Sequence, residues 1–294
     1  MIIHVRCCPL LNGVTKLYLR MIPNITQVKE KSIFWDADTY HDVSIIQENW
    51  ADTIIQKRKW TGKENLLDAG CGSGRITKIL SKIVTEGKIY AIDNDPNMID
   101  KATESLIDIE NVKVIQEDLL HINSIDISIK FDVIFSNAVL HWILDHYRIF
   151  KNFYDLLNPK GELLIQCGGY GNLQETISVF DTVKDLPKFS KYFTEWKNDW
   201  KFAKPVETEN ILKMIGYKDI KVYLTEAPAK FDNKNDYSVY LKTVVLGPYL
   251  KYLPSEEMKF TFLDTVLSFM EKHHSNLCWK LDYVRLNISA TSSK

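Results

Sequence analysis

Residues 65–74, which read N-L-L-D-A-G-C-G-S-G, constrain the fold more than any other stretch of the chain. Leu66 and Leu67 predict a short buried strand, which is followed by an acidic residue and a tight glycine loop. Glycine permits positive φ and lets a ligand approach the backbone, and the N-terminus of a following helix offers free N–H groups. Apolar residues with helical spacing follow the loop, at Ile76, Ile79, Leu80, Ile83 and Val84. This order of elements predicts a site for a nucleotide-like ligand.

The spacing of the glycines narrows the choice of ligand. A dinucleotide-binding loop reads G-x-G-x-x-G, whereas here Gly74 follows Gly72 by two positions. Asp68 precedes the first glycine, and a carboxylate there would repel a pyrophosphate but attract a cationic amine or sulfonium. The loop therefore resembles motif I of the class I S-adenosylmethionine-dependent methyltransferases. The resemblance implies that S-adenosylmethionine is bound, that S-adenosylhomocysteine is a product, and that the loop contacts are Asp68, Gly70, Cys71, Gly72, Ser73 and Gly74.

The rest of the chain alternates between strand-like and helix-like segments. Expected strands cover residues 88–92, 112–115, 131–135, 162–167, 220–224 and 281–288, and expected helices cover residues 43–55, 96–106 and 145–157. Such alternation predicts right-handed crossovers and a parallel, doubly wound sheet, whose ligands bind beyond the carboxyl ends of the strands. With the strand before the glycine loop, we expect an α/β fold of seven mostly parallel strands. The family resemblance implies that the last strand is antiparallel.

We expect one Rossmann-like methyltransferase domain over residues 35–294, preceded by a poorly ordered extension over residues 1–34 in which Met21 is an alternative start. Two aromatic-rich inserts, at about residues 171–205 and 232–275, are expected to form a helical lid. The net charge of −1 gives no global attraction to nucleic acid or to an anionic membrane. No apolar run approaches the roughly 18 residues that a membrane span needs.

The five cysteines are odd in number and show no metal-ligand spacing. Reduced thiols in a cytoplasmic protein without a bound metal are therefore expected. The sequence does not define the oligomeric state, so a monomer is the default expectation.

Polar residues follow successive strands, and the resemblance assigns them to the cofactor. Asp93 ends the second strand, where a carboxylate accepts both ribose hydroxyl protons. Asp118 follows the third strand and would receive the adenine amino group, and Asn137 ends the fourth strand beside the methionine part. The other implied contacts are Asn94, Met98 and Leu119, of which Met98 and Leu119 would flank the adenine ring. One such residue alone would more simply cap a strand end; the repeated order favours ligand contacts.

A second resemblance concerns the acceptor. Residues 136–142 read S-N-A-V-L-H-W, similar to the F-x-N-x-x-L-[HQ]-W segment of the trans-aconitate and juvenile hormone acid methyltransferases. Tyr40, Ser44 and Gln47 have the spacing of Y-x-x-x-N-x-x-Q in the latter group, with Ser replacing Asn. The resemblance covers residue 35 onward but is poor over residues 171–205. It implies that the active site contains Tyr40, Gln47, His141 and Trp142.

Carboxyl methylation suits these residues. A carboxylic acid with a pKa of about 4 is ionised at neutral pH and needs no catalytic base, so the enzyme supplies orientation and exclusion of water. The Gln47 amide and the Trp142 indole N–H are neutral donors that would hold a carboxylate without quenching it. Beyond Arg75 the chain has two arginines, Arg148 and Arg285, which favours an apolar monocarboxylic acid over the tricarboxylate aconitate.

Other interpretations stay open. Trp142 could be core packing and Gln47 an exposed helix residue. His141 could deprotonate a hydroxyl, phenol or amine, which would make the protein a different small-molecule O- or N-methyltransferase. Adjacent residues are expected to point in different directions, so only one of His141 and Trp142 would face the acceptor. A protein that binds S-adenosylmethionine without catalysis is a third possibility. Nucleic-acid methylation is disfavoured, because residues 136–139 lack the [DNS]-P-P-[FYW] signature.

Overall fold

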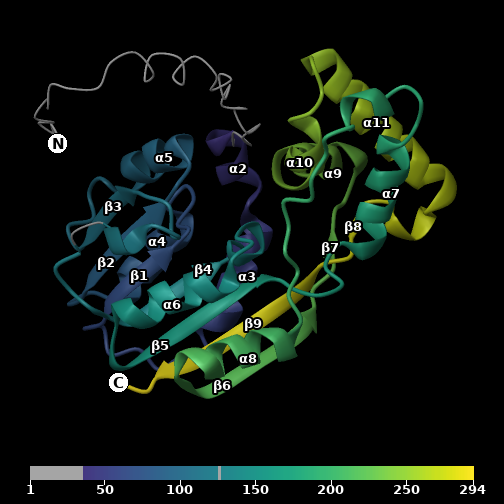
Figure 1. Cartoon of the computed structure of the whole chain (residues 1–294). Coiled ribbons are helices and arrows are strands. Elements are labelled where there is room, and N and C mark those ends of the chain that lie inside the picture. Colours follow the sequence, from purple (N-terminus) through teal and green to yellow (C-terminus); the bar gives the residue numbers. More distant parts are fainter. Residues whose placement is uncertain (1–35, 125–126) are drawn as a thin grey trace, which may run out of the picture. The chain divides into compact units, whose positions relative to one another are not determined.

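A mixed sheet of seven strands forms the centre of the fold (Figure 1). The computed structural model describes residues 36–124 and 127–294, and the extension expected over residues 1–34, with Met21, lies outside them. The strands of the sheet are β1 (Asn65–Ala69), β2 (Lys88–Asp93), β3 (Val112–Gln116), β4 (Phe131–Asn137), β5 (Leu157–Gly168), β6 (Tyr217–Glu226) and β9 (Val284–Ser292). Their order is β3-β2-β1-β4-β5-β9-β6, and β9 pairs antiparallel with both neighbours. The expected doubly wound, mostly parallel α/β fold is confirmed.

Helices cover both faces of this sheet, because side chains alternate along each strand. The helices before β6 on the chain are α2 (Ala37–Val43), α3 (Ile45–Ile55), α4 (Arg75–Ile83), α5 (Pro96–Leu106), α6 (His146–Leu156), α7 (Gln174–Lys184) and α8 (Pro205–Ile215), with 3₁₀ turns at η1 (Ile122–Ser124), η2 (Leu140–Trp142) and η3 (Ser190–Tyr192). Leu66 of β1 packs with residues of α3 and α4, whereas Leu67 packs on the opposite face with residues of α6 and α8. The carboxyl ends of β1, β2 and β4 therefore meet at one edge, between the two layers.

A second apolar cluster lies apart from the sheet, in what we call the helical region (Figure 1). It comprises α7 together with α9 (Lys234–Tyr240), the π-helical turn η4 (Leu241–Val245), α10 (Gly247–Leu250), α11 (Glu256–His273), the 3₁₀ turn η5 (Ser275–Leu277) and the short strand pair β7 (Ala229–Lys230) and β8 (Lys280–Leu281). Buried aromatic residues such as Phe180, Tyr249 and Phe262 form its centre. The two expected inserts thus contain packed helices, and their action as a lid stays a prediction.

Several element boundaries differ from the expectations by a few residues; the strand expected over residues 281–288, for instance, begins at Val284 and ends at Ser292. Two of the differences have a clear physical reason. The helix expected from residue 43 begins at Ala37, where Asp36 caps it by accepting a hydrogen bond from the Thr39 backbone N–H (3.1 Å). It is interrupted at Ser44, whose hydroxyl donates to the His41 carbonyl (3.1 Å), a bond that competes with regular helix geometry.

The strand expected from residue 162 begins at Leu157 instead. Leu157 pairs with Phe131, and the register then shifts so that Val133 pairs with Glu162. The intervening residues form the expected turn, but the turn bulges out of a continuing strand, with Lys160 at a φ of 63°. A bulge lets the chain leave and rejoin one ladder, which a pattern of apolar residues does not reveal.

Candidate active site

The glycine loop joins β1 to α4 and is fixed to the end of β2. Its three glycines, Gly70, Gly72 and Gly74, have φ values of 81°, 54° and 79°, which favour glycine. A Cβ on Gly70 would lie 2.2 Å from the Val139 side chain. The backbone N–H of Gly70 donates to the Ile92 carbonyl (2.7 Å), and that of Gly72 donates to Asp93 Oδ2 (2.9 Å). The loop therefore tolerates no larger residue at Gly70.

A cavity opens beside this loop, and we call it the loop cavity. It is lined by Tyr40, Ser44, Gln47, Asp68, Gly70, Cys71, Gly72, Ser73, Arg75, Ile76, Phe135 and Asn137. Three buried polar atoms on its walls have no hydrogen-bond partner, namely Gln47 Oε1, Arg75 Nε and Asn137 Oδ1. Because buried polar atoms are nearly always paired, these atoms fit a site that is completed by a polar ligand.

The charges of the loop cavity suit an amino acid group. Asp68 is buried and accepts a hydrogen bond from Thr77 Oγ1 (2.7 Å), and burial raises its pKa to about 7. Arg75 is held by Glu48 (2.9 Å) and the His41 carbonyl, with its Nε left unpaired. An acid and a guanidinium in one cavity match an ammonium and a carboxylate, the two charged groups on the methionine part of S-adenosylmethionine. Arg75 was not among the predicted site residues, although it directly follows the loop.

Asp93 lies beside the glycine loop, as expected for a ribose-binding residue. Its Oδ2 accepts from Gly72 N–H and its Oδ1 from Asp95 N–H (3.0 Å). Burial raises the pKa of this carboxyl group, and those backbone bonds oppose the rise. Asp93 does not line the loop cavity, so its contact with ribose stays a prediction.

None of the other residues assigned to ribose and adenine lines the loop cavity. Asn94 is exposed, and Asp118 is half-buried with its Oδ1 accepting from Leu120 N–H (2.8 Å). Met98 and Leu119 are buried, Leu119 within the main apolar cluster on the sheet. Their roles stay predictions.

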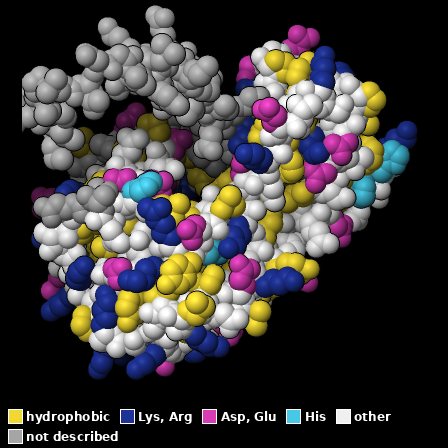
Figure 2. Space-filling model, viewed as in Figure 1, with side chains coloured by type: hydrophobic (Ala, Val, Ile, Leu, Met, Phe, Trp, Pro, Cys, Tyr) yellow, Lys and Arg dark blue, Asp and Glu magenta, His cyan; other side chains and the backbone are white. Residues whose placement is uncertain are grey.

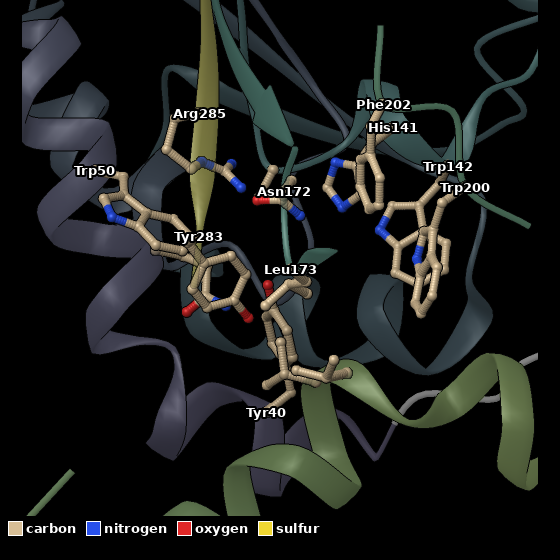
Figure 3. A pocket seen from close by; sticks show the side chains of 14 residues that line it. Tyr40, Trp50, His141, Trp142, Asn172, Leu173, Trp200, Phe202, Tyr283 and Arg285 are labelled. Atoms are coloured by element: carbon tan, nitrogen blue, oxygen red, sulfur yellow. The ribbon is translucent and has the colours of Figure 1, made fainter. Parts of the chain in front are cut away.

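A second cavity adjoins the first, and we call it the aromatic cavity (Figure 3). It is lined by Tyr40, Gln47, Trp50, Ala138, His141, Trp142, Asn172, Leu173, Trp200, Phe202, Val244, Val245, Tyr283 and Arg285. Tyr40 and Gln47 line both cavities. The structure thus brings all four predicted catalytic residues, from α2, α3 and the turn after β4, to the lining of one cavity.

Gln47 is buried, not an exposed helix residue. Its Nε2 donates to the Tyr240 hydroxyl (2.8 Å), while its Oε1 has no partner. Amide orientation follows the hydrogen-bond network: in the flipped orientation Oε1 accepts from Tyr240 and the NH₂ group is free to donate. Asn137 Nδ2 donates to the Gln47 carbonyl (2.9 Å) and so ties α3 to the end of β4.

His141 and Trp142 both line the aromatic cavity, so these adjacent residues do not point to different places. That only one of them faces the acceptor stays a prediction. They lie on the 3₁₀ turn η2, with ring centroids 5.3 Å apart and planes inclined by 37°. Trp142 also packs against Trp200, at 5.7 Å between centroids. Packing and lining the cavity are therefore compatible for this residue.

His141 is a neutral ring in this environment. Burial, with Arg285 and His146 nearby, lowers its pKa well below the usual value. Its Nδ1 accepts a hydrogen bond from Gly168 N–H (3.3 Å), which favours the tautomer with the proton on Nε2. In that tautomer Nε2 carries the proton, so it can donate a hydrogen bond but cannot remove a proton from the methyl acceptor.

Arg285 at the start of β9 is the cation of the aromatic cavity, and it was not predicted as a site residue. It is 2% exposed, and its guanidinium carbon lies 4.1 Å from the centroid of the Trp50 ring. Figure 3 shows the guanidinium group pointing into the space between Trp50 and His141. Its Nε and Nη2 have no hydrogen-bond partner. The sequence offered one signal, a cation within the W-K-L-D-Y-V-R-L segment of the acceptor resemblance.

Two broader features concern partners. Across residues 36–124 and 127–294, no group of three or more His, Cys, Asp or Glu residues could hold a metal ion. No helix in the described part of the chain is both long and apolar enough to cross a membrane. On the face shown in Figure 2, basic and acidic side chains are interspersed.

Known proteins provide an independent comparison. A family model described as a methyltransferase domain matches residues 61–237. Malonyl-[acyl-carrier protein] O-methyltransferase 1 of Ilyobacter polytropus is 34% identical over 160 residues, which are 53% of this chain and 59% of that protein. Trans-aconitate 2-methyltransferase of Escherichia coli is 30% identical over 132 residues, 45% of this chain and 50% of that protein. The chain thus matches less than two thirds of the length of the first relative and half the length of the second.

Solved structures agree on the fold. Phosphoethanolamine N-methyltransferase 2 of Haemonchus contortus, solved with phosphomonomethylethanolamine and S-adenosylhomocysteine, has a TM-score of 0.56 at 17% identity, covering 88% of this chain and 57% of that one. The [4+2]-cyclase SpnF has a TM-score of 0.53 at 13% identity, covering 83% of this chain and 81% of that one. Since one fold carries both methyl transfer and cyclisation, function has to be argued from the site.

Proposed function

Because this chain belongs to the family of methyltransferase domains, we propose that it transfers the methyl group of S-adenosylmethionine to the carboxylate of a small molecule, forming a methyl ester. The two curated relatives are named for malonyl-[acyl-carrier protein] and trans-aconitate, which supports a carboxylate acceptor. The observation that carries the proposal is the absence of a catalytic base among the described residues of the aromatic cavity. Of its lining residues, none is an acid.

The remaining titratable groups in that cavity are donors. His141 is neutral, with its Nδ1 already occupied by Gly168 N–H. Burial raises the pKa of Tyr40 and of Tyr283 well above the usual value, so both hydroxyls keep their protons. An amine, alcohol or phenol would need a base to lose its proton, whereas a carboxylate is already ionised. The side chains therefore favour an acceptor that enters as an anion.

The chain's own residues would bind and orient both reactants. Asp68, Arg75 and Asn137 would hold the charged ends of the methionine part in the loop cavity. When bound, S-adenosylmethionine supplies a methyl group whose bond to sulfur breaks, both electrons staying on sulfur, as a carboxylate oxygen forms the new bond to carbon. Tyr40 and Gln47 line both cavities, so they would align the acceptor with the methyl group. The aromatic walls would exclude water, and no proton moves.

A direct test uses methyl-labelled S-adenosylmethionine and a pool of aliphatic, isoprenoid, aromatic and polycarboxylic acids. Label released as methanol by mild alkali is expected, because methyl esters are hydrolysed while ethers and methylamines are not. Gln47→Ala should lower this signal, and Gln56→Ala, an exposed glutamine at the end of the same helix, should not.

Two results would count against the ester. An alkali-stable product would indicate methylation of a hydroxyl or an amine, with His141 as the candidate base. Cofactor binding without any labelled product would favour a protein that binds S-adenosylmethionine without catalysis.

A further inference from the structure

The charge of Arg285 is buried without a counter-ion. No carboxylate in the described part of the chain forms an ion pair with its guanidinium, and two of its nitrogens have no partner. Arginine does not deprotonate in proteins, and a buried charge is costly unless it is paired. Stacking on Trp50 recovers only part of this cost. The fold therefore holds an unpaired positive charge in a cavity wall.

The groups that face Arg285 do not neutralise it. They are Tyr40 of α2, Tyr240 of α9, Tyr283 before β9 and Cys167 of β5, with His141 on the turn after β4. Burial raises the pKa of the Cys167 thiol to about 12 and those of the three tyrosines well above the usual value. At neutral pH all five are uncharged. The aromatic cavity therefore has a net charge of about +1, carried by one side chain.

We propose that Arg285 binds the carboxylate of the acceptor and restricts the aromatic cavity to acceptors with a single negative charge. This inference rests on the proposed carboxyl methylation and names its substrate class, a monocarboxylic acid with an apolar body. One oxygen of the carboxylate pairs with the guanidinium while the other faces the junction at Tyr40 and Gln47. The rest of the molecule contacts rings such as Trp142 and Trp200.

The single positive charge affects both the binding of the substrate and the release of the product. A second carboxylate would be buried against aromatic rings without a cation, so di- and tricarboxylates are rejected. Methylation removes the charge of the first carboxylate, so the ester loses its pairing with Arg285 and binds more weakly than the acid. Arg285 thus selects the substrate and favours release of the product.

A purely structural arginine would behave differently on replacement. Removing a paired buried arginine leaves its partners unsatisfied and destabilises the protein, whereas removing an unpaired one relieves an uncompensated charge. Arg285→Met keeps a long side chain against Trp50 without the charge. We expect its Tm without ligand to equal or exceed that of the wild type. Arg285→Lys keeps the charge but loses the planar fork, and Arg148→Met is the matched control, because Arg148 is exposed on α6.

The test measures binding to the full chain saturated with S-adenosylhomocysteine, by calorimetry and thermal unfolding. The probes are octanoate, geranate and benzoate, their neutral amides, and the dicarboxylate suberate. At least one monocarboxylate should bind the wild type and Arg148→Met about tenfold or more tightly than its amide does, a preference lost in Arg285→Met and partly kept in Arg285→Lys. Suberate should bind more weakly than octanoate.

Several outcomes would overturn the inference. These are binding of no monocarboxylate, equal binding of acid and amide by the wild type, or an acid preference that survives in Arg285→Met. A ligand-free Tm of Arg285→Met well below the wild type would make the residue structural, and tight binding of suberate would remove the single-charge limit. Failure of the proposed function looks different: acids bind through Arg285, but no alkali-labile methyl product forms.

Discussion

The loop cavity and the aromatic cavity share Tyr40 and Gln47 but differ in the chain segments that form them and in how their charged side chains are paired. Most of the loop cavity comes from one stretch of chain, residues 68–76, and side chains of α2, α3 and β4 complete it. Its charged residues have partners, as with Asp68 and Thr77 or Arg75 and Glu48. The aromatic cavity is assembled from distant segments and contains an unpaired Arg285. The first suits a ligand with charges of both signs, and the second suits an anion.

The largest effect is expected from Gly70→Ala in the loop cavity. The added Cβ would lie 2.2 Å from the Val139 side chain at a φ of 81°, so the loop has to move. We expect S-adenosylhomocysteine binding to be lost and the free energy of unfolding to fall by about 1–3 kcal/mol. Calorimetry and urea unfolding measure both.

The control is Gly171→Ala, at a φ of 84° with its nearest neighbours at 3.9 Å. It has the backbone strain without the clash and should keep cofactor binding. Tight binding by Gly70→Ala would show that the loop does not hold the cofactor.

Asp68→Asn should alter both cofactor binding and the pH dependence of stability. Burial raises the pKa of Asp68 to about 7, so between about pH 4 and pH 7 the folded state holds a proton that the unfolded state has released. This group lowers stability as the pH rises through that window, by at most about 1.4 kcal/mol per pH unit. Asp68→Asn lacks this pH-dependent loss. Its free energy of unfolding, relative to that of the wild type, should therefore be higher at pH 7 than at pH 5.

We also expect Asp68→Asn to weaken S-adenosylhomocysteine binding about tenfold or more, since a charged hydrogen bond to the ammonium group is lost. Asp100→Asn, at an exposed site on α5, is the control. The role of Asp68 would be refuted if the difference in unfolding free energy between the variant and the wild type were the same at pH 5 and pH 7 and the affinity for S-adenosylhomocysteine were unchanged.

Trp142→Phe separates the two cavities, because Trp142 lines the aromatic cavity and not the loop cavity. Loss of its indole N–H should lower kcat/KM for the acid about 10-fold to 100-fold while the affinity for S-adenosylhomocysteine stays unchanged. Steady-state kinetics measure kcat/KM, and calorimetry measures the affinity for S-adenosylhomocysteine. A parallel loss of cofactor affinity would mean that the cavities are not independent.

Asp282→Asn should have the smallest effect. Asp282 accepts hydrogen bonds from the Glu175 backbone N–H (2.7 Å) and from Thr176 N–H (3.2 Å) and Oγ1 (2.5 Å) at the start of α7. Weakening this cap should cost about 1 kcal/mol of unfolding free energy and raise KM for the acid slightly, with kcat retained. A large fall in kcat would show that the helical region contributes to the chemistry itself.

The sequence predicts these regions unequally, for a physical reason. The strand, glycine loop and helix around Asp68 are local, so a few neighbouring residues determine them. Gln47 and Trp142 were found only through family resemblance, because helix periodicity does not show which polar residue faces a cavity. Arg285 was counted merely as a scarce cation, since its burial against Trp50 depends on how β9 packs near α3. Strand ends likewise located Leu119 without showing that its side chain is buried in the core.

The most direct test of an acceptor site without a base is the pH dependence of single-turnover methyl transfer to a monocarboxylate, with S-adenosylmethionine saturating at every pH. An acceptor that arrives ionised predicts a rate that stays constant from about pH 6 to pH 9, since no residue has to lose a proton first. A rate that rises with pH through one ionisation, and loses that dependence in His141→Gln, would contradict the carboxylate mechanism and assign His141 as the base.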